Sequence, residues 1–114
     1  MIRNICKLRF RSLTQKEVGF TEIKIAYSGN ILEISDEDND AGKLYKYRLE
    51  AKLNQPAFYR YDYLQFDVTL SDGTHIFVGN SNYPAILQTS EDLDGAKIKV
   101  EWKDIYPPVF SPVS

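Results

Sequence analysis

The stretch Phe66-Asp67-Val68-Thr69-Leu70-Ser71-Asp72-Gly73-Thr74-His75-Ile76-Phe77-Val78-Gly79 decides the fold of this chain. Two runs rich in β-branched and aromatic residues flank Asp72-Gly73, a dipeptide that suits the positive φ angles of a two-residue type I′ turn. The stretch is therefore predicted to form a β-hairpin, with the facing pairs Ser71–Thr74, Leu70–His75, Val68–Phe77 and Phe66–Gly79. In that register one face is apolar and is expected to join the core; it carries Phe66, Val68, Leu70 and Phe77, with His75 near its rim.

The rest of the chain repeats this period of two. In residues 44–53 one face carries Tyr45, Tyr47, Leu49, Ala51 and Leu53, and in residues 96–105 the inward set is Ile98, Val100 and Trp102. Further strands are predicted over 4–13, where Cys6, Leu8 and Phe10 point inward, and over 18–27, 31–35 and 58–71. The last is expected to be bent: a bulge near Asp62–Leu64 would bring its tyrosines to the core side together with its aliphatic residues, and without a bulge the tyrosines lie on the other face. Residues 85–88 fit either a strand or one helical turn begun by Pro84.

Strands at this spacing indicate an all-β fold. The expectation is a single-domain antiparallel β-sandwich or small barrel of about seven to eight strands, with little or no helix. The domain is predicted to span residues 1–106, and the proline-rich segment 107–114 to form an extended tail.

Composition narrows the class of protein. The chain has 114 residues and a net charge of −2. This charge argues against a nucleic-acid partner, because proteins that bind nucleic acids normally carry an excess of basic residues. No run approaches the roughly 20 apolar residues of a membrane span, and charges interrupt the N-terminal segment where a signal peptide needs a continuous apolar run. With one cysteine, Cys6, a reducing compartment fits best, so the expected location is cytoplasmic, with no membrane partner.

The acidic segment from Asp36 to Gly42 is the strongest candidate for a metal site. Asp36, Asp38 and Asp40 match the first three ligand positions of a calcium-binding loop. The match then fails, because Ala41 stands where the loop needs glycine and Tyr47 where it needs a bidentate glutamate. A solvated hairpin loop is the preferred interpretation, and no metal or cofactor is expected.

The chain has one candidate nucleophile–base pair, Cys6 with His75, the single histidine. Both fall on inward phases, but an inward cysteine usually behaves as a small hydrophobic residue. No nucleophile elbow, phosphate-binding loop or dinucleotide-binding motif occurs in the sequence. The chain is therefore predicted not to be an enzyme.

Aromatic residues supply the candidate binding surface. Five of the eight tyrosines lie in two successive predicted strands, and the candidate set is Tyr45, Tyr47, Tyr59, Arg60, Tyr61, Tyr63 and, in the tail, Phe110. Tyrosine gives a large amphipathic contact area with little rotamer entropy to lose, which suits an interface or a sugar-stacking platform. Ordinary cross-strand aromatic packing explains the same pattern, and both interpretations remain open.

The segment 66–79 followed by Asn82-Tyr83-Pro84-Ala85 resembles small β-rich structural proteins of phages and prophages, such as tail or head–tail joining components. The resemblance covers the C-terminal half of the chain. It implies a component that oligomerises through strand edges and termini. The expected function is thus a structural, assembly or protein-interaction module with a protein partner, either a second copy or another component; the alternative is a small-ligand or carbohydrate-binding domain that uses the tyrosine-rich strands.

Overall fold

The computed structural model describes residues 2–13, 19–26, 29–39, 42–53, 64–80, 85–92 and 95–112, without the side chains of 39, 86–92, 95 and 96. This part of the chain is all-β and contains no helix. Its nine strands are β1 (Ile2–Ser12), β2 (Thr21–Ile23), β3 (Ile31–Asn39), β4 (Gly42–Lys52), β5 (Leu64–Leu70), β6 (Thr74–Val78), β7 (Ile86–Asp92), β8 (Gly95–Asp104) and β9 (Ser111–Pro112). The predicted all-β antiparallel architecture is confirmed.

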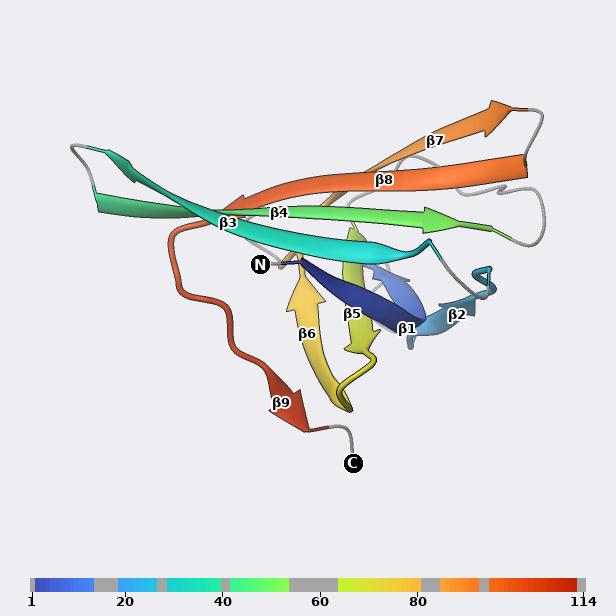
Figure 1. Cartoon of the computed structure of the whole chain (residues 1–114), viewed down its shortest axis with the longest axis horizontal. Helices are drawn as coiled ribbons and strands as arrows, with labels where there is room; N and C mark the ends of the chain where they lie inside the picture. Colours follow the sequence, from blue (N-terminus) through green and yellow to red (C-terminus); the bar gives the residue numbers. More distant parts are fainter. Residues whose placement is uncertain are drawn as a thin grey trace.

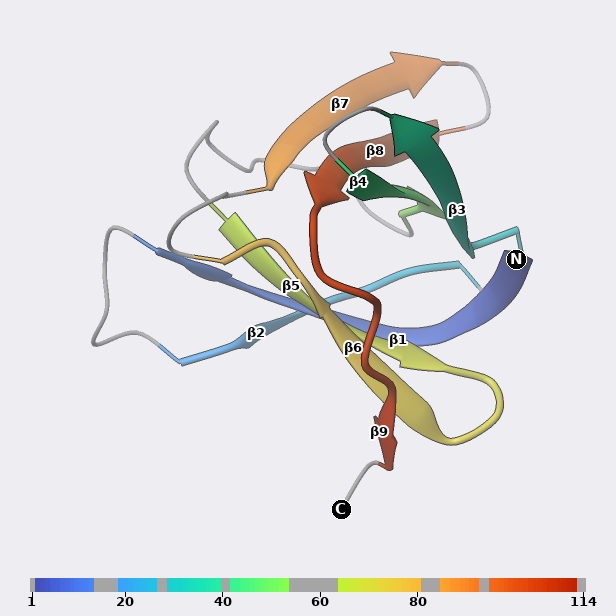
Figure 2. The same cartoon turned by 90° about the vertical axis from the view of Figure 1, so that its left-hand side faces the viewer.

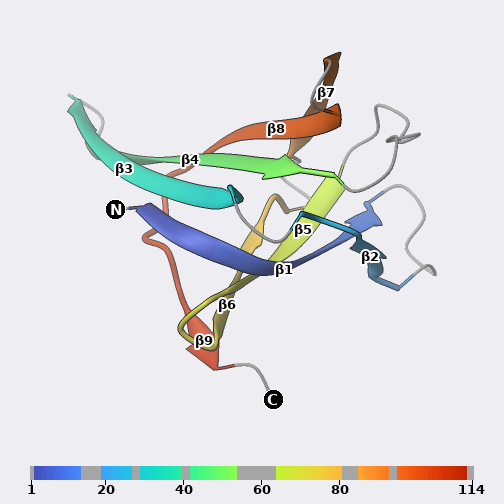
Figure 3. The same cartoon turned by 45° about the vertical axis from the view of Figure 1, so that its right-hand side comes forward.

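The strands form one bent antiparallel sheet in the order β7-β8-β4-β3-β1-β5-β6-β9, with β2 added beside β1. Figure 1 shows β7, β8, β4 and β3 in one layer and β1, β2, β5 and β6 in a second layer that crosses beneath it. Strand β1 joins the layers, because Asn4 pairs with Ile31 of β3 while Leu8 pairs with Ile23 of β2. Figure 3 shows the same crossing with the right-hand side of the molecule turned forward.

A two-hydrogen-bond bridge closes this bent sheet. Leu64, at the start of β5, exchanges backbone hydrogen bonds with Ala85, just before β7, at 2.9 and 3.2 Å. The path from β7 through β8, β4, β3 and β1 to β5 therefore returns to its beginning, as in a small barrel. The β6 strand and β9 continue beyond this closure.

The core lies between the two layers and follows the predicted alternation. Strand β4 buries Tyr47, Leu49 and Ala51, and its Cα partners on β8, Trp102, Val100 and Ile98, are buried as well. The crossing layer contributes fully or nearly fully buried side chains from β1, β5 and β6, namely Ile5, Leu8, Leu64, Phe66, Val68, Leu70, Ile76 and Val78. One continuous apolar interior thus holds the two layers together.

The β5–β6 hairpin turns through three residues, Ser71 to Gly73, so the predicted two-residue type I′ turn is wrong. Gly73 has a φ of 86°, whereas no described non-glycine residue has a positive φ, so Asp72 cannot take the conformation that type I′ requires. The Gly73 amide donates to the Leu70 carbonyl at 3.1 Å, as in a type I turn closed by a left-handed glycine. The backbone amide and the hydroxyl of Thr74 donate to Asp72 Oδ1 at 3.0 and 2.6 Å, which stabilises the longer loop.

The extra loop residue shifts the register of β6 by one position. Val68 faces Ile76 and Thr69 faces His75, so Ile76 and Val78 enter the core. Phe77, predicted to be buried, is instead 45% exposed, and His75 lies on the outer face rather than the core side. A shift of one residue exchanges the two faces of a strand, which explains both errors.

Strand β1 contains a bulge that the sequence did not indicate. Its pairing with β5 shifts between Ile5, opposite Leu70, and Lys7, opposite Thr69, which leaves Cys6 as the extra residue. Cys6 is exposed, so its predicted inward position is wrong, and Ile5 takes the core position instead. The bulge falls where β1 passes from one layer to the other, and a bulge supplies the added twist that such a crossing needs.

Several strand boundaries differ from those expected. Strand β3 continues to Asn39, so Asp36 and Asp38 belong to a paired strand rather than to a solvated loop. Residues 86–92 form strand β7, which resolves the ambiguous segment in favour of a strand. Strand β2 is shorter than predicted, and the proposed bulge near Asp62–Leu64 lies largely outside the described residues.

No helix in the described ranges is long and apolar enough to cross a membrane.

Candidate interaction site

The C-terminal strap, residues 105–112, is the segment that leaves the two layers. It begins after β8 with a bend in which the Ile105 amide donates to Asp104 Oδ1 at 2.8 Å. Pro107 and Pro108 then restrict the backbone to extended conformations. Figure 2 shows the strap descending beside β6 to β9, where Ser111 and Pro112 pair with His75 and Thr74. Strand β9 thus covers the beginning of the β6 edge.

Apolar side chains of the strap are unusually exposed. Ile105, Tyr106 and Val109 are 56%, 67% and 73% exposed. Phe110 differs, because it is partly buried against the core and the Arg3 guanidinium lies 5.0 Å from its ring centroid. One aromatic anchor and a two-residue strand therefore attach a segment whose other large side chains face solvent.

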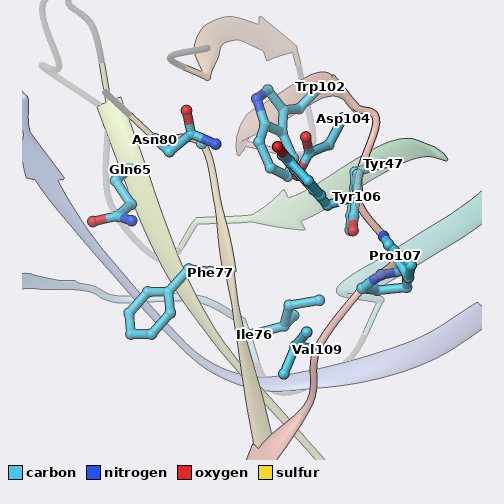
Figure 4. Close-up of a pocket in the computed structure, with 12 residues that line it drawn as sticks. Tyr47, Gln65, Ile76, Phe77, Asn80, Trp102, Asp104, Tyr106, Pro107 and Val109 are labelled. Carbon is cyan, nitrogen blue, oxygen red and sulfur yellow. The ribbon is translucent and has the colours of Figure 1, made fainter. Parts of the chain in front are cut away.

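Between the strap, β6 and the end of β8 lies an open cleft of about 260 Å³. Figure 4 shows Tyr47, Trp102 and Tyr106 gathered on one side of it and Gln65 and Phe77 on the other. The rings of Tyr47 and Trp102 pack with their centroids 4.8 Å apart. Polar groups reach the same space from Asn80 and Asp104. An aromatic lining with a few convergent polar groups is the usual composition of a ligand or peptide cleft.

Burial is the main cause that raises the pKa of the Tyr47 phenol, to about 12, with smaller contributions from Asp104 and Tyr45. An unfolded chain ionises its tyrosines near pH 10, so between pH 10 and 12 the folded state holds one more proton at Tyr47 than the unfolded state. The contribution of Tyr47 to stability is therefore fully present below pH 10 and is lost as the pH rises toward 12.

We predict that Tyr47→Phe flattens this alkaline loss of stability. The difference between wild type and variant should reach about 2 kcal/mol by pH 12, since one pKa unit corresponds to about 1.4 kcal/mol. Urea unfolding at pH 8, 10, 11 and 12 measures it. Tyr106→Phe, at a position 67% exposed, is the matched control and should keep the wild-type slope. Parallel profiles for wild type and Tyr47→Phe would contradict the prediction.

The candidate residues named from sequence fall into three groups. Tyr47 is 3% exposed, packs in the core and lines the cleft, whereas Tyr45 is partly buried against the core. Phe110 anchors the strap. Tyr59, Arg60, Tyr61 and Tyr63 lie outside the described residues.

The outer face of β1, β5 and β6 holds a second cluster, centred on a buried carboxylate. Asp67 is 1% exposed; it forms an ion pair with Arg9, and its Oδ1 lies 2.9 Å from His75 Nδ1. Because a carboxylate can only accept, Nδ1 carries the proton in this contact. The guanidinium of Arg9 lies 5.2 Å from the Phe20 ring centroid, and the Phe20 and Phe77 rings are 5.9 Å apart. Phe77 is the Cα partner of Asp67 across β5 and β6, so this pair of rings lies beside the buried carboxylate.

In this cluster His75 contacts Asp67 and not Cys6, the partner considered from sequence. The hydrogen-bond partner of His75 is Asp67, and Cys6 is exposed at the β1 bulge, two strands away from β6. The structure thus brings a histidine and a carboxylate together, but with Arg9 neutralising the carboxylate. Within the described ranges, no group of three or more histidine, cysteine or acidic side chains is placed to hold a metal ion. In the acidic segment, Asp36 forms an ion pair with Lys43 at 3.2 Å and Glu37 with Lys46 at 2.7 Å; Asp40 lies outside the described residues.

Sequence reasoning missed most of the cleft. Trp102, Asp104 and Tyr106 share one phase of the β8 alternation and its continuation, so the pattern itself contained a signal for three lining residues. Gln65, Asn80 and the strap prolines could not be found in this way, because their meeting depends on where the strap runs. Comparison of the chain with models of protein families, with curated proteins and with solved structures found no match.

Proposed function

We propose that this chain is a non-enzymatic assembly or protein-interaction module that associates through its strap and the adjoining edge of β6. The observation that carries the proposal is the exposure of Ile105, Tyr106 and Val109 on one short segment. Exposed apolar side chains that gather beside a cleft are typical of protein contact surfaces. The partner is a protein, and self-association into a homo-oligomer is the form we expect.

The part of the β6 edge to which the described chain adds no strand supports this function. Strand β9 pairs with Thr74 and His75, and the described chain adds no further strand to the edge from Ile76 to Val78. Unpaired backbone groups on a sheet edge form hydrogen bonds with an incoming strand, while side-chain pockets give specificity. A phage-type virion or assembly component would use an edge and a terminus in this way. The single thiol fits a reducing compartment, so we place the module in the cytoplasm.

A test removes the exposed side chains of the strap. We predict that Tyr106→Ser combined with Val109→Ser weakens self-association about tenfold or more, because loss of two apolar contacts at an interface exceeds roughly 1.4 kcal/mol. Light scattering coupled to size exclusion, from about 1 to 100 µM, measures the mass. Both side chains are more than 60% exposed, so the thermal midpoint of the dissociated monomer, measured at the lowest concentration, should not change. Ile2→Ser, which removes a side chain of 63% exposure outside the strap, is the control. A wild type that stays monomeric and captures no protein would refute the proposal.

The cleft supports a second candidate function, a small-ligand or carbohydrate-binding domain. Rings of Tyr47, Trp102 and Tyr106 with the polar Gln65, Asn80 and Asp104 suit the faces and hydroxyls of a sugar. Trp102 is the single tryptophan of the chain and lines this cleft, so its fluorescence reports on occupancy directly. Fluorescence that stays constant across a panel of sugars would eliminate this candidate.

A further inference from the structure

The strap is attached to its own chain at two small anchors. Its last described residues pair with β6 through two partners, Thr74 with Pro112 and His75 with Ser111. The other anchor is Phe110, which packs partly buried on the core beneath the Arg3 guanidinium. Both anchors recognise a short extended segment, and neither depends on which chain supplies that segment.

The part of the strap before these anchors has the properties of a hinge. Pro107 and Pro108 favour an extended backbone, so the segment does not fold back easily onto its own domain. Ile105, Tyr106 and Val109 flank the prolines and face solvent. In the closed form, in which the strap lies on its own chain, three large apolar side chains are therefore exposed. They lie at the position where two copies would meet if the hinge opened.

We infer that the strap is exchanged between two copies of this chain, so that residues 109–112 of each copy occupy the β6 edge and the Phe110 site of the other. The inference rests on the proposed function, for which it names the partner as a second copy. The anchor contacts are the same in the closed and the exchanged forms, because exchange replaces a segment with an identical one. The forms differ in the entropy lost on association, which favours the monomer, and in the burial of Ile105, Tyr106 and Val109 at the new contact, which favours the dimer.

A second copy fits the site better than an unrelated protein does. The β6 edge already pairs with Ser111 and Pro112 of this sequence, and the Arg3 guanidinium already covers the ring of Phe110. An unrelated partner would have to displace a segment that is tethered to the same chain and therefore present at high effective concentration. A second copy supplies the same segment and adds the hinge contact.

The experiment uses disulfide trapping between singly substituted chains. In a Cys6→Ser background, one chain carries Thr74→Cys and another carries Pro112→Cys, positions that are Cα partners across β6 and β9. Neither chain can form the β6–β9 disulfide within itself. The two are mixed at high concentration, equilibrated in mild denaturant, returned to buffer and oxidised. Exchange predicts a covalent heterodimer on a non-reducing denaturing gel. A mixture of Lys99→Cys with Pro112→Cys, in which Lys99 is exposed on β8, is the control for random collision and should give little product.

The oligomeric mass, measured on the same samples, separates the inference from the proposed function. An oligomer with the covalent heterodimer supports both. An oligomer without heterodimer above the collision control overturns the exchange and leaves the assembly function standing. A monomer without heterodimer overturns the exchange and self-association together, and leaves a different protein as partner. The variant Pro107→Gly with Pro108→Gly loosens the hinge and should lower the trapped fraction about threefold; an unchanged fraction would contradict the role of the prolines.

Discussion

Gly79→Ala is expected to destabilise the protein by about 3 to 4 kcal/mol. Gly79 has a φ of 95°, which costs an alanine about 1 to 2 kcal/mol. A Cβ at this position would also lie 2.6 Å from the Leu64 carbonyl oxygen and 2.9 Å from the Ala85 amide nitrogen. These atoms form the bridge that closes the sheet, and they are backbone atoms that cannot rotate away. Relief of the clash opens the bridge and removes two hydrogen bonds worth about 1 kcal/mol each.

Two other glycines separate backbone strain from close approach. Gly73 has a similar φ of 86°, but no atom lies within 4 Å of the position that a Cβ would take, so Gly73→Ala should cost about 1 to 2 kcal/mol. Gly19 has open space and no left-handed φ, and Gly19→Ala should change stability by less than about 0.5 kcal/mol. Urea unfolding of the three variants gives the ranking. Equal costs for Gly79→Ala and Gly73→Ala would show that the bridge does not approach Gly79.

Strands β4 and β8 could be predicted from their residues alone. The alternation in each strand indicates which side chains are buried, and it can be read without knowing the partner strand. Tyr47, Leu49, Val100 and Trp102 are buried as their phase predicts. Sequence patterns therefore predicted the fold class and the core faces of β4 and β8.

The hairpin register needed information that the Asp72-Gly73 dipeptide does not contain. That dipeptide suits both a two-residue and a three-residue loop, and the choice rests on side-chain bonds from Thr74 to Asp72. The same bonds, first the one from the Thr74 hydroxyl, hold the pKa of Asp72 below its usual range. An error of one residue in a turn was enough to place Phe77 and His75 on the wrong face.

The candidate site was less predictable because distant segments build it. The cleft exists where the strap crosses the edge of β6, and local periodicity carries no information on that path. Asp67 occupies a phase that alternation assigns to solvent, yet it is buried, with Phe77 as its Cα partner on β6 and Phe20 packed against the ring of Phe77. The burial of this carboxylate depends on which strands lie beside β5, and the sequence pattern of β5 alone does not contain that information.

Arg9→Met is expected to destabilise the protein by about 3 kcal/mol through this carboxylate. Asp67 is 1% exposed, so loss of Arg9 leaves a buried anion with His75 as its remaining side-chain partner in the described structure. Methionine keeps much of the apolar contact with Phe20, so the effect reports mainly on charge. Asp67→Asn should cost less, about 1 to 2 kcal/mol, because the guanidinium left behind is 40% exposed and can be hydrated.

A double-mutant cycle isolates the interaction. With Asn at position 67 there is no buried anion to leave unpaired, so Arg9→Met should then cost less than about 1 kcal/mol, and the coupling energy should be about 2 kcal/mol. The exposed pair Lys24–Glu22, at 3.5 Å with side chains 67% and 43% exposed, is the matched control and should show coupling within about 0.5 kcal/mol. Because Asp67 is shielded from solvent, its coupling to Arg9 should persist in 1 M salt, where the control pair is screened. An Arg9→Met cost that is the same with aspartate and with asparagine at position 67 would mean that Arg9 acts through its packing against Phe20 and not through the buried charge.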